Sequence, residues 1–543
     1  MRLQFFSRLF FLSLFATLST QAVFAGQNSV YLALEIKHQG PTMESLADQV
    51  TDPTSPRYGK PFSLDEINQA TPVDGAAYAK LRAKLTALGL TLKRESPDHH
   101  YIFIEADAPT VEKAFSVKIV SRVMQGVFEY VSTGTPKLDG ELALINHVVG
   151  LDSGATVQNA HHPKLRRDGM APSYQGDPKR DTKTVDDYYG NTELLAKGYD
   201  GSGVKIGIFQ VGQVDLDHVK TYHAQLGTAK VPNFEVIACG MYDGKTIDQG
   251  SRVENAIDLE VASRYAPGAT IRSYITGALS TTAETVDAYA KMVDEVDVIS
   301  TSYGTGNNEH SPSARAADLA LSPIFAKAVA LGKTVYSASG DDGSNYINGK
   351  PVVESPTSKN IITVGATAFK THAQTGAILN EVAWPLSGGG ISAYEPAPLY
   401  QGKVTKIKTR AMPDVSHYGS NELQPFYVLG FDASGNISQT PGWSLVSGTS
   451  LAAPAKAGFM AKVIAARKAL GKPALPFMGP VYYDLYADAA ACADVFRDIV
   501  EGNNINPPGP GRSDYSSTTG FDQVTGIGTM KGGVELFNKL IAL

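Results

Sequence analysis

Ser450 stands in a pattern that suits a nucleophilic serine. It closes the segment Ser447-Gly448-Thr449-Ser450, and a run of small residues containing Pro454 follows. The pattern predicts a tight bend that delivers the Ser450 hydroxyl to the N-terminus of a helix. Backbone N–H groups and the helix dipole favour negative charge there, as a developing oxyanion requires. The alternative is a hydroxyl that only caps an alanine-rich core helix.

Glu254 and Asp258 are spaced i and i+4 in a segment whose other residues are mostly apolar. On a helix the two carboxylates would share one face. A proton shared between close carboxylates raises one pKa above the usual value of about 4.3 for Glu. The pair could therefore act as a base in acid solution. The alternative is a solvated acidic face.

Asp341 lies in Ser339-Gly340-Asp341-Asp342-Gly343, which continues a predicted buried strand at 334–338. In α/β proteins, catalytic groups gather beyond the carboxyl ends of the strands. The alternative is an ordinary Asp-Gly turn.

A histidine base finds no support in the sequence. No G-x-S-x-G elbow surrounds Ser450. The histidines of the C-terminal part stand in no recognisable triad context: His218, His223, His310, His372 and His417. A base made of carboxylates fits better.

Taken in chain order, these motifs resemble those of the sedolisins, the serine-carboxyl peptidase family. The N-terminal Asp52-Pro53-x-Ser55-Pro56-x-Tyr58 resembles the activation domain of the same family. The resemblance implies a serine-type peptidase, made as an inactive precursor, with a subtilisin-like fold. We expect an endopeptidase, and exopeptidase activity is the alternative that the resemblance leaves open.

Carried over, the resemblance makes Ser450 the nucleophile, Glu254 its general base and Asp258 the group that orients Glu254. Asp341 becomes the oxyanion-hole residue. To donate a hydrogen bond Asp341 must carry a proton, whereas the base must be partly ionised, so we expect an optimum below about pH 5.

The resemblance also implies one structural Ca²⁺ near the C-terminus. Its ligands would be the carboxylates of Asp498 and Asp522 and the backbone carbonyls of Ile499, Thr518 and Gly520, with water. Thr518 departs from the family, whose members often have glycine there. The alternative is two unrelated turns.

Ser302-Tyr303-Gly304 resembles the edge that pairs with the substrate backbone, with tyrosine where several relatives have tryptophan. Gln210 stands where some relatives carry a further acidic residue, which leaves the pH profile open.

The N-terminus predicts export. Arg2 and Arg8, an apolar run and the small-residue ending at Ala25 describe a cleaved signal peptide. Beyond it we expect an activation prodomain at 26–151, a linker with the processing site at 152–183 and a catalytic domain at 184–543. The protein would be secreted, to the periplasm or beyond.

The composition describes a globular chain of 543 residues with a formal charge of -6, which favours neither nucleic acid nor a membrane as partner. We expect a monomer whose partners are protein or peptide substrates and its own prodomain, acting as an intramolecular inhibitor. Whether Cys239 and Cys492 pair stays open.

Apolar periodicity predicts two α-and-β architectures. The first part suits a small ferredoxin-like α+β domain with helices on one face of an antiparallel sheet. Strands near 204–209, 270–275, 296–302, 334–338 and 361–364 alternate with helices at 253–265, 283–293 and 323–331. They predict a doubly wound parallel sheet. We expect the third helix to begin at Pro323 after a Ser322 cap.

Two other functions remain open. One is a non-catalytic relative that binds peptides on the same fold, and the other is a hydrolase of another class, such as an esterase.

Overall fold

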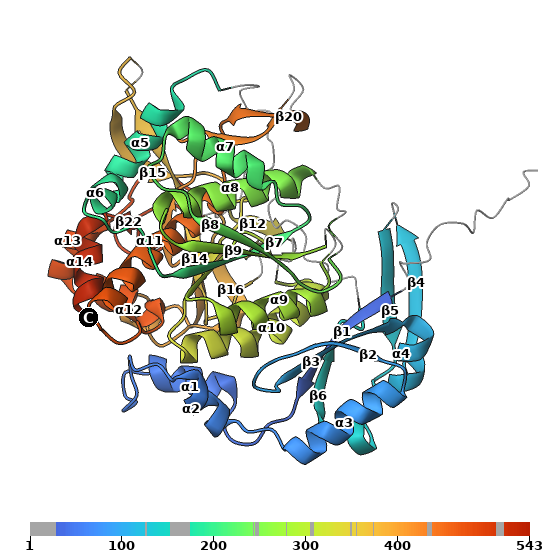
Figure 1. The fold of residues 1–543 in the computed structure, drawn as a ribbon. Coiled ribbons are helices and arrows are strands. Elements are labelled where there is room, and N and C mark those ends of the chain that lie inside the picture. Colours follow the sequence, from blue (N-terminus) through green and yellow to red (C-terminus); the bar gives the residue numbers. More distant parts are fainter. Residues whose placement is uncertain are drawn as a thin grey trace, which may run out of the picture.

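The computed structural model describes residues 29–124, 127–152, 174–242, 244, 249–277, 280–304, 309–347, 350–353, 356–372, 374–431, 437–505 and 515–543. The predicted signal peptide and most of the predicted linker lie outside these ranges. The described chain forms a smaller N-terminal domain, blue in Figure 1, and a larger C-terminal domain. None of the described helices is long and apolar enough to cross a membrane.

The N-terminal domain is built on a four-stranded antiparallel sheet in the order β2-β3-β1-β6. Helices α3 and α4 connect its strands, and this order of elements is the expected ferredoxin-like one. A hairpin of β4 and β5 extends from it (Figure 1). The elements are β1 (Ser29–Ile36), α1 (Met43–Thr51), α2 (Leu64–Ala70), α3 (Gly75–Ala87), β2 (Thr91–Glu95), β3 (Tyr101–Asp107), α4 (Ala108–Phe115), β4 (Lys118–Met124), β5 (Val127–Thr133), η1 (Gly140–Leu144) and β6 (Ile145–Val149).

Strand β1 is buried on both faces. Val30, Leu32 and Leu34 pack in the core of the N-terminal domain, under α3 and α4. Tyr31 and Ala33 point the other way and join a core shared with the C-terminal domain. Since side chains alternate along a strand, β1 holds the two domains together.

The C-terminal domain is organised by an eight-stranded sheet in the order β15-β14-β11-β10-β7-β9-β8, with β18 also paired to β14. Every pairing is parallel except that of the edge strand β15. The strands are β7 (Lys205–Val211), β8 (Asn233–Ala238), β9 (Thr270–Thr276), β10 (Val298–Thr301), β11 (Val335–Ala338), β14 (Ile362–Thr371), β15 (Ile378–Ala383) and β18 (Val415–Tyr418).

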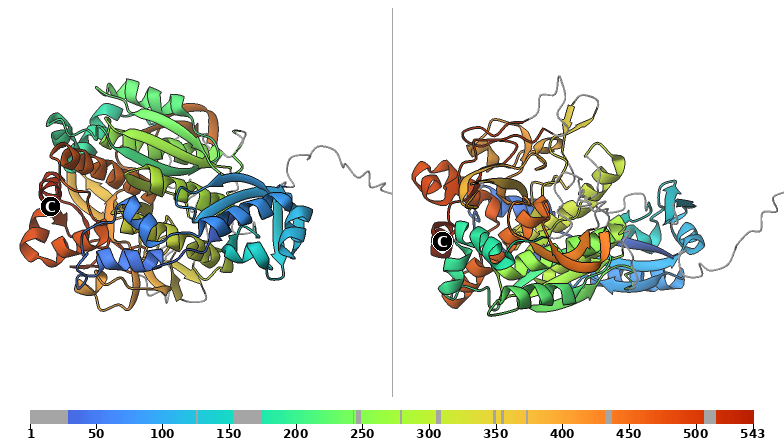
Figure 2. Two further views of the ribbon diagram at one scale, coloured as in Figure 1. Left: turned by 60° about the horizontal axis from the view of Figure 1, so that its bottom comes forward. Right: turned by 90° about the horizontal axis from the view of Figure 1, so that it is seen from above.

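Helices cover both faces of this sheet, as expected for a doubly wound fold. Helices α8 (Gln249–Tyr265) and α11 (Thr449–Ala469) pack together on one face. Helices α9 (Thr282–Glu295) and α10 (Pro312–Ala330) lie on the other, where the N-terminal domain covers them (Figures 1 and 2). The doubly wound architecture is therefore confirmed.

Smaller elements complete the C-terminal domain. They are α5 (Pro178–Tyr188), α6 (Asn191–Ala196), α7 (Leu216–Leu226), β12 (Asn345–Ile347), β13 (Lys350–Val352), β16 (Gly390–Pro396), η2 (Gln401–Lys403), β17 (Thr409–Met412), β19 (Phe426–Phe431), β20 (Ile437–Ser444), α12 (Met478–Ala487), α13 (Ala489–Val495), β21 (Phe496–Arg497), β22 (Thr529–Met530) and α14 (Val534–Ala542).

The predicted start of one helix at Pro323 is wrong. Helix α10 begins at Pro312 and continues through Pro323. Proline removes the N–H that would bond the carbonyl of Leu319, four residues earlier. Because Leu319 lies on an exposed side of the helix, water can satisfy that carbonyl. The alanine-rich segment before Pro323 therefore stays helical.

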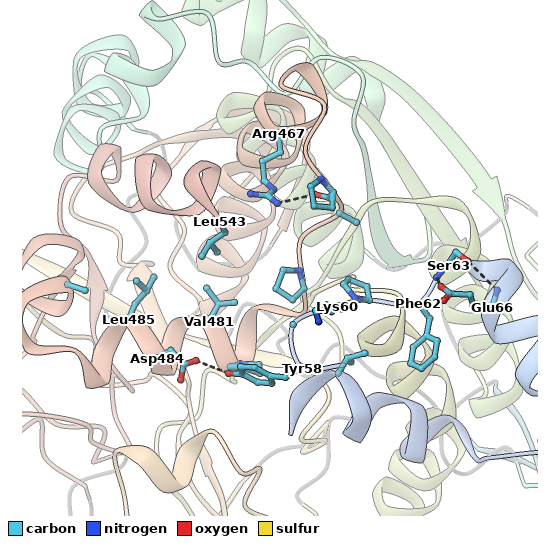
Figure 3. A pocket seen from close by; sticks show the side chains of 18 of the residues that line it. Tyr58, Lys60, Phe62, Ser63, Glu66, Arg467, Val481, Asp484, Leu485 and Leu543 are labelled. Carbon is cyan, nitrogen blue, oxygen red and sulfur yellow. Dashed lines mark hydrogen bonds between the residues drawn. The ribbon is translucent and has the colours of Figure 1, made fainter. Parts of the chain in front are cut away.

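A cavity of about 740 Å³ lies at the seam between the domains, remote from the predicted catalytic residues. Residues from Tyr58 to Ser63 line one side, and α12 with the C-terminal Leu543 lines another (Figure 3). The Tyr58 hydroxyl donates a 2.7 Å hydrogen bond to Asp484 across this seam. The N-terminal domain thus contacts α12 of the C-terminal domain as well as α9 and α10.

Candidate functional site

Helix α8 places Glu254 and Asp258 inside the protein. Their residues are 1% and 0% exposed, and everything from Val253 to Tyr265 is buried. The helix packs against β7 and α11, so its polar and charged side chains are enclosed together with its apolar ones. The solvated acidic face is therefore excluded for this pair.

Ser450 occupies the second position of α11, directly after the turn at Gly448 and Thr449. The Gly448 N–H donates a 2.8 Å bond to the carbonyl of Gly419, which holds the turn against the end of β18. Pro454 has no N–H to bond the Ser450 carbonyl. The structure therefore places the Ser450 hydroxyl at the N-terminus of a helix, as the sequence predicts.

Ser450 Oγ and Glu254 Oε1 are both buried and have no hydrogen-bond partner among the described residues. The two side chains lie close enough for the hydroxyl to lower the Glu254 pKa. A hydroxyl and a carboxyl oxygen that lie close together and have no other partner suit a nucleophile and its base, whose mutual hydrogen bond is often long before substrate binds.

Asp341 follows β11 and reaches the same turn. Its Oδ1 accepts hydrogen bonds of 2.8 Å from both the N–H and the hydroxyl of Thr449. The negative charge of Asp341 also raises the Glu254 pKa. The structure therefore brings all four predicted catalytic residues, Glu254, Asp258, Asp341 and Ser450, to one site.

Ser302 and Tyr303 directly follow β10, and both touch α8. The Ser302 hydroxyl donates a 2.7 Å bond to Asp258 Oδ1, and the Tyr303 hydroxyl donates a 2.6 Å bond to Asn255 Oδ1. The sequence assigned this segment to substrate binding only. Its contact with the carboxylate pair was missed, and so was Asn255, whose only signal is a polar side chain between the two acids.

Gln210, near the end of β7, also faces the carboxylate pair. Its Nε2 donates a 2.9 Å bond to the Asn255 carbonyl, and its Oε1 accepts a 2.5 Å bond from Ser273. Its amide lowers the Asp258 pKa. The Gln210 amide therefore occupies the position where an acidic residue would add another titratable group beside the pair.

Burial dominates the electrostatics of the pair. It raises the Glu254 pKa well above the usual value, and the charge of Asp258 raises it further. Burial also raises the Asp258 pKa, and hydrogen bonds from Ser302 and Gln210 oppose that rise. The pair therefore retains protons to higher pH than ordinary carboxyls.

The buried histidines bond elsewhere. His417 Nε2 lies 2.9 Å from the Tyr265 hydroxyl, and His223 Nε2 lies 2.7 Å from the Ser263 hydroxyl. Because Ser450 Oγ has no partner in the described part of the chain, no described histidine is its base in this structure. The absence of a histidine triad in the sequence agrees with this geometry.

The predicted calcium ligands lie around one loop. The Gly520 N–H donates a 2.9 Å bond to Asp498 Oδ2, and the Thr518 N–H donates a 2.9 Å bond to Asp522 Oδ2. Within the described ranges no three His, Cys, Asp or Glu side chains gather as a metal-binding group. Two carboxylates with backbone carbonyls would not count as such a group, so the calcium site stays a prediction.

Two family models match the chain. Residues 21–153 match the pro-kumamolisin activation domain, and residues 239–476 match the subtilase family, peptidase S8. Kumamolisin of Bacillus sp. (strain MN-32) is 28% identical over 490 residues, which cover 86% of this chain and 83% of kumamolisin.

Among solved structures, Pseudomonas sedolisin, a serine-carboxyl proteinase complexed with two molecules of pseudo-iodotyrostatin, matches 68% of this chain and 98% of its own. The TM-score is 0.53 and the identity 26%. The chain belongs to the sedolisin family. Its sedolisin-like fold and N-terminal activation domain make it a serine-type peptidase produced as a proenzyme.

Xanthomonalisin of Xanthomonas sp. (strain T-22) is another sedolisin relative, 24% identical over 93% of this chain. The match spans 64% of xanthomonalisin, so part of that protein has no counterpart here.

Proposed function

We propose that this sedolisin is an acid-active endopeptidase that cleaves peptide bonds through an acyl-enzyme at Ser450. The observation that carries the proposal is the unpartnered Ser450 hydroxyl, buried beside the unpartnered Oε1 of Glu254. Asp341 lies on the other side of the nucleophile turn.

In the proposed reaction Glu254 takes the proton of Ser450 as its Oγ attacks the carbonyl carbon of the substrate. The same proton then passes to the leaving amine, and the peptide C–N bond breaks. Water repeats the sequence and releases the acid product. Asp258, held by Ser302, orients Glu254 and adjusts its charge.

Asp341 would stabilise the tetrahedral intermediate. Its Oδ1 already accepts two hydrogen bonds from Thr449, so a proton on this carboxyl belongs on Oδ2. A protonated Oδ2 donates to the developing oxyanion, as oxyanion-hole donors do. This role requires acid solution, because an ordinary Asp loses its proton near pH 4.

The precursor organisation completes the proposal. Residues 1–25 would be removed as a signal peptide during secretion to the periplasm or beyond. The activation domain, 26–151, would hold the enzyme inactive until cleavage in the 152–183 linker. Helix α5 begins at Pro178, after an Asp177 cap, which favours cleavage before that point. The mature enzyme, 184–543 in the sequence prediction, would act as a monomer on proteins and peptides.

One Ca²⁺ would hold the C-terminal loop through Asp498, Asp522 and the carbonyls of Ile499, Thr518 and Gly520. Asp522 Oδ1 already accepts three hydrogen bonds, from the N–H groups of Val524 and Thr525 and from the Thr525 hydroxyl. Asp522 Oδ2 and Asp498 Oδ2 each accept one backbone N–H, so these oxygens and Asp498 Oδ1 would be the carboxylate ligands of a cation. A bound ion would supply structural stability and no step of the hydrolysis.

The proposal is tested by assaying an acid-denatured protein substrate from pH 2.5 to 8 with wild type and Ser450→Ala. We expect wild-type activity with an optimum below about pH 5 and none in the variant. Peptide binding without cleavage by the wild type would support a non-catalytic relative. Cleavage by Ser450→Ala, or a preference for simple esters at neutral pH, would support a hydrolase of another class.

A further inference from the structure

We propose that Asn255 and Tyr303 are positioning residues that hold the segment after β10 against α8 and so keep Ser302 hydrogen-bonded to Asp258. This inference rests on the proposed function, because it concerns the same carboxylate pair. It assigns a role to two side chains that neither attack nor bind the reacting bond.

Asn255 fixes α8 to the end of β7. Its Nδ2 donates two hydrogen bonds of 2.8 Å, to the carbonyls of Val211 and Gln213. Its own carbonyl accepts the bond from Gln210 Nε2. Asn255 is fully buried, and a buried amide with its partners satisfied holds a single orientation.

Tyr303 links the Asn255 side chain to the end of β10, the strand next to β7. Its hydroxyl donates to the remaining polar group of the Asn255 side chain, Oδ1, at 2.6 Å. Its ring packs edge-on against Phe209, with ring centroids 5.9 Å apart. The Tyr303 N–H also donates to Thr301 Oγ1 at 3.2 Å. The side chain therefore has one position, set by α8 on one side and by β7 on the other.

Ser302 lies between the end of β10 and Tyr303. Its 2.7 Å bond to Asp258 requires the segment to stay close to α8. A serine that donates to a carboxylate stabilises the charged form. The strength of the Ser302–Asp258 bond therefore depends on how firmly the next residue, Tyr303, is held.

The groups that face the pair are few. Asp341 comes from the β11 side, Gln210 from β7 and Tyr289 from α9. Gln210 does not titrate, and Tyr289 keeps its proton throughout the acid range because burial raises its pKa. Among the described residues, Asp341 is the one further charge that affects the pair. A change in the pKa of the pair caused by moving Ser302 can thus be measured from the pH dependence of activity.

The test is the pH dependence of kcat/KM for acid-matured Tyr303→Phe, which removes one oxygen and keeps the ring. Loosening Ser302 raises the pKa of the pair, so the acidic limb of the profile moves up by about one pH unit, the size expected for one hydrogen bond to a charged group. At the foot of that limb kcat/KM falls about tenfold. Ser302→Ala gives the same shift, and the double variant adds little to it.

Tyr336→Phe is the matched control. It removes a 2.8 Å bond between two buried tyrosines, Tyr336 and Tyr482, away from the pair. It lowers the melting temperature without moving the profile. An unchanged profile for Tyr303→Phe, or a shift that adds fully to that of Ser302→Ala, would overturn the inference.

A variant that fails to mature is tested as a precursor carrying Ser450→Ala. The loss of stability caused by Tyr303→Phe then grows as the pH rises through the raised pKa of Asp258, about 8, because ionised Asp258 has lost its donor. A pH-independent loss would overturn the positioning role. Failure of the proposed function is distinguishable, because it would appear as full activity of Ser450→Ala with Tyr303 intact.

Discussion

The Asp341 carboxylate accepts a 2.8 Å hydrogen bond from the backbone N–H of Thr449, the residue before Ser450. Because the Thr449 hydroxyl donates to the same oxygen, the segment after β11, which carries Asp341, and the N-terminus of α11, which carries Ser450, are held together through one atom. The other oxygen of Asp341 lies against Gly448, on the side of the nucleophile.

Asp341→Asn imitates the protonated carboxyl, since its oxygen can accept from Thr449 while its NH₂ donates. We expect Asp341→Ala to lower kcat by about 10²–10³ and Asp341→Asn to keep at least ten times more activity than Asp341→Ala. The measurement is kcat at the acid optimum for wild type and both variants. Equal losses in Asn and Ala would contradict the role of donor.

The carboxylate pair also predicts how stability depends on pH. Burial raises the pKa of Glu254 and Asp258 in the folded state. Each group therefore stabilises the fold fully below its unfolded pKa, near 4, and loses that contribution as the pH rises toward its folded pKa. The slope is at most about 1.4 kcal/mol per pH unit for each group.

The variant Glu254→Gln/Asp258→Asn has no such loss. Its stability relative to wild type should therefore improve steadily from pH 4.5 to 6.5, as thermal melting of Ser450→Ala precursors would measure. The comparison cancels the buried histidines, whose lowered pKa values act in the opposite direction in both proteins. A constant difference across this range would contradict the raised pKa values.

Arg94 is predicted to hold the activation domain in place. It pairs at 2.5 Å with Asp287 of α9, a buried carboxylate that also accepts from the Tyr31 hydroxyl and the Gly240 N–H. Arg94→Met leaves that charge without its cation and should weaken docking by about 3 kcal/mol, the lower end of the range for a buried pair, because Arg94 is partly exposed. We expect faster conversion of the precursor in acid and measurable peptidase activity before cleavage.

The control is Lys93→Met, the neighbouring residue, whose partner Glu105 lies in the same domain and whose side chain is largely solvated. Such an exposed ion pair contributes about 0–1 kcal/mol to the stability of the fold. Gel electrophoresis of timed samples measures conversion in both. Equal rates would contradict a special role of Arg94.

Calcium should stabilise the mature enzyme through the C-terminal loop. At a concentration 100 times its Kd, a ligand that binds only the folded state adds about 2.7 kcal/mol. We expect Ca²⁺ to raise the melting temperature of wild type but not of Asp498→Asn. Asp494→Asn, an exposed carboxylate near Lys539, is the control and should keep the shift. An equal shift in all three proteins would place the ion elsewhere.

The sequence predicted the catalytic residues better than the hydrogen bonds that hold them in position. Glu254 and Asp258 share a helix, so local spacing alone places them together, and the motif around Ser450 marks its own turn. The Ser302–Asp258 and Tyr303–Asn255 bonds join residues 44 and 48 positions apart, and no local pattern encodes them.

The same limit applies to the fold. Strand β2 was not predicted, because its sequence Thr-Leu-Lys-Arg-Glu is polar and packs at the edge of a sheet. The sequence predicts a helix start at Pro323, whereas α10 continues through it, because the carbonyl of exposed Leu319 can bond water instead. Strands β7, β9, β10, β11 and β14 of the parallel sheet were predicted, because their apolar sequences leave little choice of environment. Strands β8 and β18 of the same sheet were not predicted.

The most direct test of the account is the mass of the Ser450 peptide after a rapid acid quench of wild-type enzyme with a peptide ester near pH 4. We predict that the acyl group of the substrate appears on Ser450, that Glu254→Gln greatly slows its formation, and that Ser450→Ala carries none. An acyl group on another residue, or turnover by Ser450→Ala without any acylation, would contradict the account.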